Sequence, residues 1–199
     1  MSGDSSSLAK LKAFAFREGI TKDDASGMEE EFAGSSDRGC ALILSAVIER
    51  RLESVIRSIL REDLSNTEKI ELFSHEGAMG SFSSKIQIGY ALGIYGKKTK
   101  HDLTLIRHLR NAFAHTRKPL RFEMKVVRDV CEIFVLPRER PTLMKFSNYP
   151  VPLQERYEQW WDKNDPRIRF EVACHIVGSG LDGAALASAS SEPIEEILP

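Results

Sequence analysis

The chain has 199 residues, of which 42% are hydrophobic and 29% are charged, and its formal net charge at pH 7 is -1. This composition suits a globular domain with a hydrophobic core, and a charge so near zero excludes a general attraction to nucleic acid or anionic membranes. No apolar run reaches the roughly 18 residues of a membrane span, and the opening MSGDSSSLAK lacks a secretory pattern, so we expect a cytoplasmic protein that makes no membrane contact.

The first 35 residues are acidic and are punctuated by glycine and serine. Helices are expected over residues 8–17 and over residues 21–34, where Thr21 to Asp24 form a cap-like start. We interpret residues 1–35 as an acidic N-terminal appendage to a larger domain.

A long amphipathic helix is predicted over residues 36–62. Its apolar residues recur every three or four positions, which is the spacing of one wide buried stripe on a helix. These residues are Leu44, Val47, Ile48, Leu52, Val55, Ile56, Ile59 and Leu60. Ser65 and Glu68 then have the spacing of a capping box, which opens a short helix that ends near Phe73.

Further helices are expected over residues 81–96, 101–114 and 122–134. In the first of these, Gly89 and Gly93 are expected to allow the close approach of a neighbouring helix. The sequence therefore predicts an all-α helical bundle with its core over residues 36–135. The residues of the second helix that are expected to face this core are Leu105, Ile106, Leu109 and Phe113.

Prolines dominate the part of the chain that follows, so we interpret residues 136–180 as an extended connection with an accessory segment, within which residues 166–177 fit a helix or a strand. Gly178 to Gly183 spell G-x-G-x-x-G. Only 16 residues follow Gly183, too few for the second strand and the acidic residue of a dinucleotide site. We expect a flexible turn there and a flexible tail over residues 181–199.

The three cysteines, Cys40, Cys131 and Cys174, are isolated, and no C-x-x-C occurs. This pattern favours buried thiols in a reducing compartment over a disulfide framework or a structural zinc site. We expect neither a metal nor a cofactor.

The stretch IRHLRNAFAH, residues 106–115, is the main candidate for chemistry. Arg107, Asn111 and His115 are four residues apart and share a helix face, whereas Arg110 and His115 are about 140° apart. An imidazole can take a proton from a ribose hydroxyl at neutral pH, and a guanidinium can hold a phosphate. The alternative is a solvated helix C-terminus, where the helix dipole favours these cations anyway.

The residues around this stretch are strongly basic. Between residues 97 and 128, ten cations and two anions leave a charge of +8. Such a segment is typical of a surface that binds a polyanion. The alternative is that Glu29, Glu30 and Glu31 neutralise it. The predicted nucleic-acid-binding residues are Lys97, Lys98, Lys100, Arg107, Arg117, Lys118 and Arg121.

Three runs resemble the mannitol operon repressor family: GSSDRGCALILSAVIERRLESVI, LFSHEGAMGSFSSKIQIGYALGI and DLTLIRHLRNAFAH. The second run is the most specific, with Gly77, Gly80, Lys85 and the stretch from Tyr90 to Gly93. The resemblance implies an all-helical cytoplasmic regulator of transcription that lacks a recognisable DNA-binding motif. This sequence likewise shows no helix-turn-helix.

Residues 110–115 are also similar to the R-x4-H signature of the HEPN superfamily, in which many members are metal-independent ribonucleases and others bind RNA without cutting it. The resemblance implies that Arg110 binds phosphate, that Asn111 is the polar residue after it, that His115 is catalytic, and that the protein is a homodimer. Three functions stay open. The first is a dimeric regulator without catalysis that acts through a protein or through nucleic acid, RNA more than DNA. The second is an endoribonuclease, and the third is a structural module that meets an acidic protein.

Overall fold

The computed structural model describes residues 35–60, 63–139 and 164–188. Every regular element in these ranges is a helix, which confirms the all-α prediction. The helices are α3 (Asp37–Ser58), α4 (Asn66–Phe73), α5 (Phe82–Ala91), α6 (Lys97–His115), α7 (Lys125–Glu132), α8 (Leu136–Glu139) and α10 (Pro166–Ser188). The chain divides into two units, Met1–Ser35 and Ser36–Pro199. The helices expected before residue 35 lie outside the described residues.

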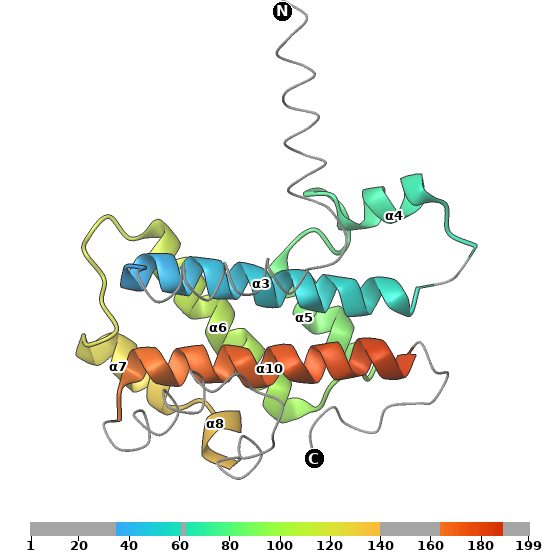
Figure 1. Cartoon of the computed structure of the whole chain (residues 1–199). Helices are drawn as coiled ribbons and strands as arrows, with labels where there is room; N and C mark the ends of the chain where they lie inside the picture. The colour runs from blue at the N-terminus through green and yellow to red at the C-terminus, as the bar shows by residue number, and fades with distance from the viewer. Residues whose placement is uncertain (1–34, 61–62, 140–163, 189–199) are drawn as a thin grey trace, which may run out of the picture. The chain divides into compact units, whose positions relative to one another are not determined.

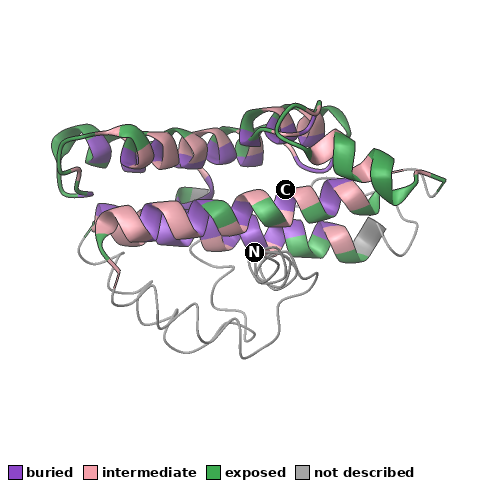
Figure 2. Cartoon of the chain, turned by 90° about the horizontal axis from the view of Figure 1, so that it is seen from above, coloured by how far each residue is buried: buried purple, intermediate pink, exposed green. Residues whose placement is uncertain are grey.

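The fold of the second unit is built on α3 and α10, which lie side by side and run in the same direction (Figure 1). Ion pairs join them at both ends: Arg167 to Asp37 at 3.1 Å and Arg51 to Asp182 at 3.3 Å. α5 and α6 pack against each other and cross behind this pair, so that the helices form two layers when seen from above (Figure 2).

The core between the layers is apolar and, at one end, aromatic. The Phe122 ring contacts Phe113 of α6, with a centroid distance of 4.9 Å, and Phe170 of α10, with a centroid distance of 5.3 Å. All three rings are buried. Aromatic contacts of this kind add about 0.5–1.5 kcal/mol beyond area burial, so they fix the loop before α7 against both layers.

The structure confirms the helix predicted over residues 36–62, which ends early at Ser58, and the short helix predicted to end near Phe73. α3 begins after Ser36, whose hydroxyl accepts a hydrogen bond from the Gly39 amide. Its predicted stripe is half-buried at Val47 and buried at Leu44, Ile48, Leu52, Val55 and Ile56. Ile59 is 38% exposed because the helix ends before it. α4 begins with the predicted capping box of Ser65 and Glu68.

The helix expected over residues 81–96 is shorter than predicted, because α5 ends at Ala91 and Gly93 adopts a positive φ of 73°. That conformation favours glycine and terminates the helix. Gly89 does allow a close approach, but of the Tyr95 side chain, since an added Cβ would lie 2.8 Å from Tyr95 Oη. The prediction that Gly89 and Gly93 face a neighbouring helix is therefore wrong.

The chain after residue 135 also differs from the prediction. Leu136–Glu139 forms α8 rather than extended backbone, and Gly178 to Gly183 lie inside α10, so the predicted turn is wrong, as is the start of a flexible tail at residue 181. Gly178 has a packing role: an added Cβ would lie 2.3 Å from Nη1 of Arg51, which passes over α10 to reach Asp182. α10 packs along α3 and belongs to the core.

The three cysteines are buried and free, as the sequence predicts for their thiols. Burial raises the pKa of Cys131 to about 12 and also raises the pKa values of Cys40 and Cys174.

None of the helices in the described ranges has the length and the apolar character of a membrane span.

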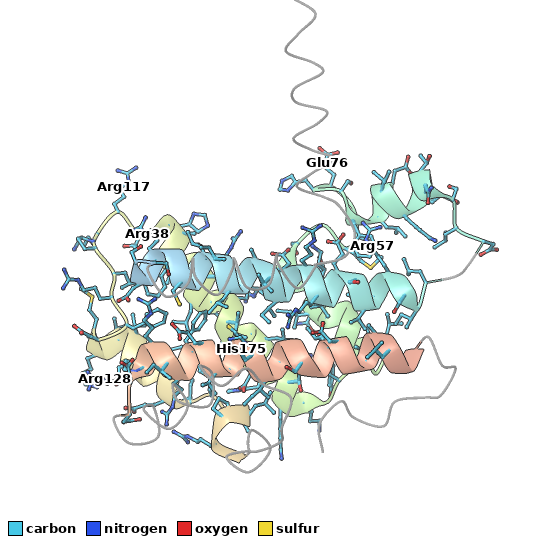
Figure 3. All side chains as sticks on the ribbon, viewed as in Figure 1. Arg38, Arg57, Glu76, Arg117, Arg128 and His175 are labelled. Carbon is cyan, nitrogen blue, oxygen red and sulfur yellow. The ribbon has the colours of Figure 1, made fainter. Side chains whose placement is uncertain are left out.

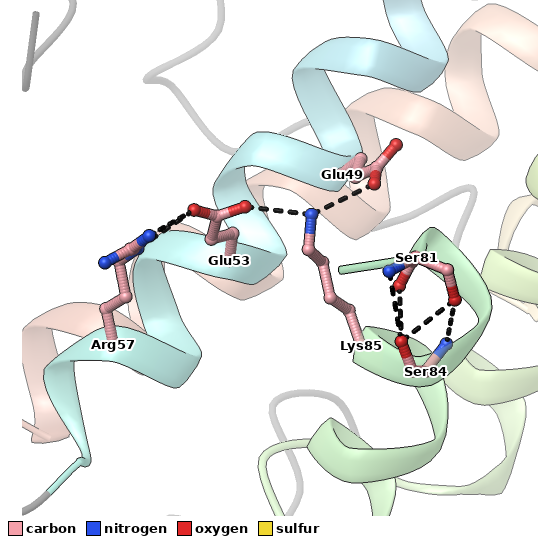
Figure 4. Close-up of polar contacts among 6 residues, drawn as sticks. All are labelled: Glu49, Glu53, Arg57, Ser81, Ser84 and Lys85. Atoms are coloured by element: carbon pink, nitrogen blue, oxygen red, sulfur yellow. Dashed lines mark hydrogen bonds and ion pairs between the residues drawn. The ribbon is translucent and has the colours of Figure 1, made fainter. Parts of the chain in front are cut away.

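Lys85 is a buried cation at the junction of α5 with α3. The residue is 5% exposed, and its Nζ lies 3.0 Å from Glu49 Oε1 and 2.8 Å from Glu53 Oε2. Arg57 Nη2 lies 2.8 Å from the other oxygen of Glu53 (Figure 4). Burial tends to raise the pKa of Glu53, but the hydrogen bonds from Lys85 and Arg57 outweigh it and hold this pKa below its ordinary value of 4.5.

The substitution Glu53→Gln is expected to lower the free energy of unfolding at pH 7 by about 1–2 kcal/mol, because two charge-assisted hydrogen bonds are lost. A carboxylate with a lowered folded-state pKa stabilises the protein above its ordinary pKa and loses this effect as the pH falls through the folded-state value. The difference between native chain and variant should therefore shrink below about pH 4.5. Urea unfolding from pH 3 to pH 7 measures it, with Glu76→Gln, at an exposed position (Figure 3), as the control. A difference that grows on acidification would contradict this role.

The substitution Gly183→Ala is expected to stabilise the protein by about 0.5–1 kcal/mol, since alanine favours a helix and an added Cβ meets no atom within 4 Å. Gly178→Ala is the matched control in the same helix. Its gain should be smaller or reversed, because Arg51 must move. Thermal unfolding compares the two, and a Gly183→Ala variant without added stability would argue against helix at this position.

Candidate nucleic-acid interface

α6 carries most of the predicted site residues. Its buried residues recur every three or four positions, and at about 100° per residue the opposite side of the helix is polar. The buried residues are Thr99, Asp102, Leu103, Ile106, Leu109 and Phe113. We call the opposite side the α6 face; its residues are Lys97, Lys100, Thr104, Arg107, His108, Asn111 and His115.

The four residues singled out in the stretch 106–115 differ in their exposure and in their contacts. His115 is exposed at the last residue of α6, whereas Arg107, Arg110 and Asn111 are half-buried. Arg110 Nη1 donates to Asn111 Oδ1 at 3.0 Å, and Arg107 Nη2 lies 3.0 Å from His108 Nε2. The structure thus brings Arg110 and Asn111 together. Within the described ranges, no hydrogen bond joins either of them to His115.

The loop after α6 extends the basic surface. Arg117, Lys118 and Arg121 are all exposed on it, and Figure 3 shows Arg117 projecting outward. Arg38 Nη2 donates to the Thr116 carbonyl at 2.9 Å, so the first turn of α3 holds the start of the loop.

The same turn of α3 also holds the end of this loop. The Phe122 amide donates to Asp37 Oδ2 at 2.9 Å. Residues 116–122 are therefore anchored at both ends. Asp37 and Arg38 lie 85 and 78 positions from their partners, so no local sequence pattern indicates these contacts.

The beginning of the α6 face is also cationic. Lys97 and Lys98 are exposed, and Lys100 is half-buried with its Nζ 4.1 Å from the centre of the Tyr90 ring. A cation over the face of an aromatic ring is attracted to it, which restrains the position of the ammonium group. We call the α6 face, Lys98 and the cations of the loop together the cationic surface.

Asp102, one of the two anions in this basic segment, is directed into the core. It is 0% exposed, and its oxygens accept hydrogen bonds from the amides of Val135 and Leu136, at 3.0 and 2.9 Å. Its Oδ1 also lies 3.0 Å from His101 Nδ1. Burial raises the pKa of Asp102, against the effect of these hydrogen bonds. Asp102 therefore binds the backbone at the start of α8, and its carboxylate is not placed among the cations of the cationic surface.

Most cations of this surface are not neutralised by ion pairs in the part of the chain that the structure describes. Six of its cations have no carboxylate within 4.0 Å there: Lys97, Lys100, Arg107, Arg117, Lys118 and Arg121. The predicted alternative, neutralisation by Glu29, Glu30 and Glu31, falls outside the described residues.

No protein-family model matches the chain, and no curated protein is significantly similar to it. The two family resemblances therefore stay predictions. Among the described residues, no group of three or more histidine, cysteine or acidic side chains is placed to hold a metal ion. The chemistry that the site offers is that of guanidinium, ammonium and imidazole groups presented to an anion.

Proposed function

We propose that the protein is a regulator of the mannitol-repressor kind that binds nucleic acid through the cationic surface and catalyses no reaction. The observation that supports this most is the separation of charge on α6. Lys97, Arg107 and the cations of the loop point away from the core without carboxylate partners in the described ranges, while Asp102 is buried. Lysine and arginine that face phosphates release condensed counterions, which drives binding.

The resemblance also implies a homodimer, and we keep this as part of the proposal. A second copy would double the number of phosphate contacts and so raise affinity without any new residue. Light scattering of the purified protein, which gives the molar mass in solution, tests the dimer separately from binding.

Binding should depend steeply on salt and on the loop. The double variant Arg117→Glu with Lys118→Glu is expected to weaken binding to a fluorescent 20-nucleotide RNA or DNA probe by about 10-fold or more, and to reduce the slope of log affinity against log salt by about two. Fluorescence anisotropy at several salt concentrations measures both.

The matched control reverses two charges away from the cationic surface: Lys69→Glu on α4 with Arg128→Glu on α7, where Arg128 lies far from Arg117 in Figure 3. It should keep most of the affinity. Equal losses in both variants would mean that only net charge matters. No binding at low salt would reject nucleic acid as the partner and favour the acidic protein instead.

A metal-independent endoribonuclease is the second candidate, and it is favoured by an exposed His115 on the same helix as the Arg110–Asn111 hydrogen bond. In this reaction His115 takes the proton of a ribose 2′-hydroxyl, and the 2′-oxygen attacks the adjacent phosphorus. The bond to the 5′-oxygen breaks, and that oxygen leaves with a proton. The products are a 2′,3′-cyclic phosphate and a 5′-hydroxyl end. Arg110 would stabilise the charge that grows on the phosphate.

If the second candidate is right, purified protein should cleave RNA in EDTA, and His115→Ala should slow cleavage by about 100-fold or more. Gel analysis of a labelled RNA, with the cyclic phosphate identified by mass, measures this. Arg107→Ala, which changes a neighbouring cation on the same face, is the control for weakened binding. The absence of cleavage at high protein concentration would remove this candidate and leave the binding proposal intact.

A further inference from the structure

The cationic surface lacks the side chains on which single-stranded nucleic acid stacks. Among residues 97–121, Phe113 is the one phenylalanine, tyrosine or tryptophan, and it is fully buried against Phe122. The nearby Tyr90 ring is half-buried and is covered by Lys100 Nζ at 4.1 Å from its centre. Proteins that bind single strands combine a basic groove with exposed aromatic rings, each worth about 1–3 kcal/mol per stacked base. This surface is therefore suited to phosphates and sugars and not to unstacked bases.

The histidines of α6 do not replace the missing aromatic rings as a surface on which bases stack. His101, His108 and His115 are exposed and seven residues apart, so they lie about 10.5 Å from one another along the helix axis. Successive bases of one strand are about 3.4 Å apart. In addition, ring nitrogens of His101 and His108 already contact Asp102 and Arg107, both at 3.0 Å.

α6 is also too deeply seated to enter the major groove of DNA. It packs against α3, α5 and α10, and Thr104, Arg107 and Asn111 in the middle of its face are half-buried. A helix that reads bases must penetrate a groove about 8.5 Å deep. The α6 face fits a shallow surface instead.

The order of groups along α6 matches one shallow groove with phosphates on both sides. Cations lie at the start of the helix, at Lys97 and Lys100, and again in the loop after its end. Between them, over a helix length of about 22 Å, the hydroxyl of Thr104, the imidazole of His108 and the amide of Asn111 surround a single guanidinium, that of Arg107. A-form RNA has a wide, shallow minor groove that displays 2′-hydroxyl groups between two phosphate backbones. Hydroxyl and amide groups such as those of Thr104 and Asn111 suit those hydroxyls.

We infer that the cationic surface binds double-stranded RNA across a minor groove, through phosphates and 2′-hydroxyl groups and without reading the base sequence. This inference rests on the proposed function and names its partner. Asn111 is central to it, because Arg110 occupies Asn111 Oδ1 and so turns the amide nitrogen of Asn111 into a fixed donor.

The test compares four fluorescent probes of one 20-base-pair sequence at the same salt concentration: double-stranded RNA, double-stranded DNA, single-stranded RNA, and an RNA duplex with 2′-O-methyl groups. We expect double-stranded RNA to bind about 10-fold tighter than each of the others. An RNA duplex of unrelated sequence should bind as tightly as the first. Binding of DNA or of the single strand as tightly as the RNA duplex would overturn the inference and leave the proposed function standing. No binding of any probe would overturn both.

A substitution at Asn111 tests whether α6 is responsible for the preference for double-stranded RNA. Asn111→Ala is expected to weaken binding of double-stranded RNA about fivefold and to leave the binding of double-stranded DNA unchanged, because only RNA offers the 2′-hydroxyl. Arg128→Ala on α7 is the control and should alter neither. Circular dichroism and the unfolding temperature check that both variants fold. The 2′-O-methyl duplex tests the contact with 2′-hydroxyl groups in the native chain. The inference can therefore still be refuted if Asn111→Ala fails to fold.

Discussion

The carboxylate of Asp37 joins three segments that lie far apart in the sequence. It sits in the first turn of α3, where the helix dipole favours an anion, and its two oxygens contact Arg167 of α10 at 3.1 Å and the Phe122 amide at 2.9 Å. Because α3 and α10 run in the same direction, their positive N-terminal ends lie at the same end of the pair. An acidic group between them offsets this unfavourable arrangement.

The contacts of Asp37 also position the basic loop, residues 116–122, of the candidate interface. Arg167 also donates to Glu171 at 3.0 Å, so the cation is shared between two acids and fixes the start of α10. The Phe122 backbone is held by Asp37 while its ring is buried between Phe113 and Phe170. With Arg38 bound to the carbonyl of Thr116, the basic loop is tied to the core at both ends. Its cations are therefore presented from a restrained backbone, which lowers the conformational entropy lost on binding.

The fold could be predicted from the sequence where one local rule dominates. The apolar spacing of α3 and the Ser65–Glu68 capping box determine their helices without help from the rest of the chain. The C-terminal part of α10 could not be predicted, because Gly178 and Gly183 disfavour a helix by propensity and only packing along α3 overrides this. The end of α5 also differs from the prediction, but here the cause is local: Gly93 has a positive φ, which ends the helix regardless of packing.

The candidate site was predictable in its charge and not in its geometry. A count of residues 97–128 gives the excess of cations, and a helical period sends Asp102 inward and Arg107 outward. The anchors Asp37 and Arg38 were beyond reach, since a single sequence carries no signal for pairs so distant. The same charge separation explains how a chain with a net charge of -1 presents a basic surface.

The geometry of α6 also separates the two candidate functions. Arg110 is half-buried at the edge of the core side, and His115 is exposed about 140° further around the helix. The two groups therefore start from different faces of α6, so a ribonuclease has to bring them to one phosphodiester through side-chain reach or through a second copy. Binding needs no such assembly, because the α6 face and the loop present their cations from a single chain. Binding is therefore the function that demands less of the structure.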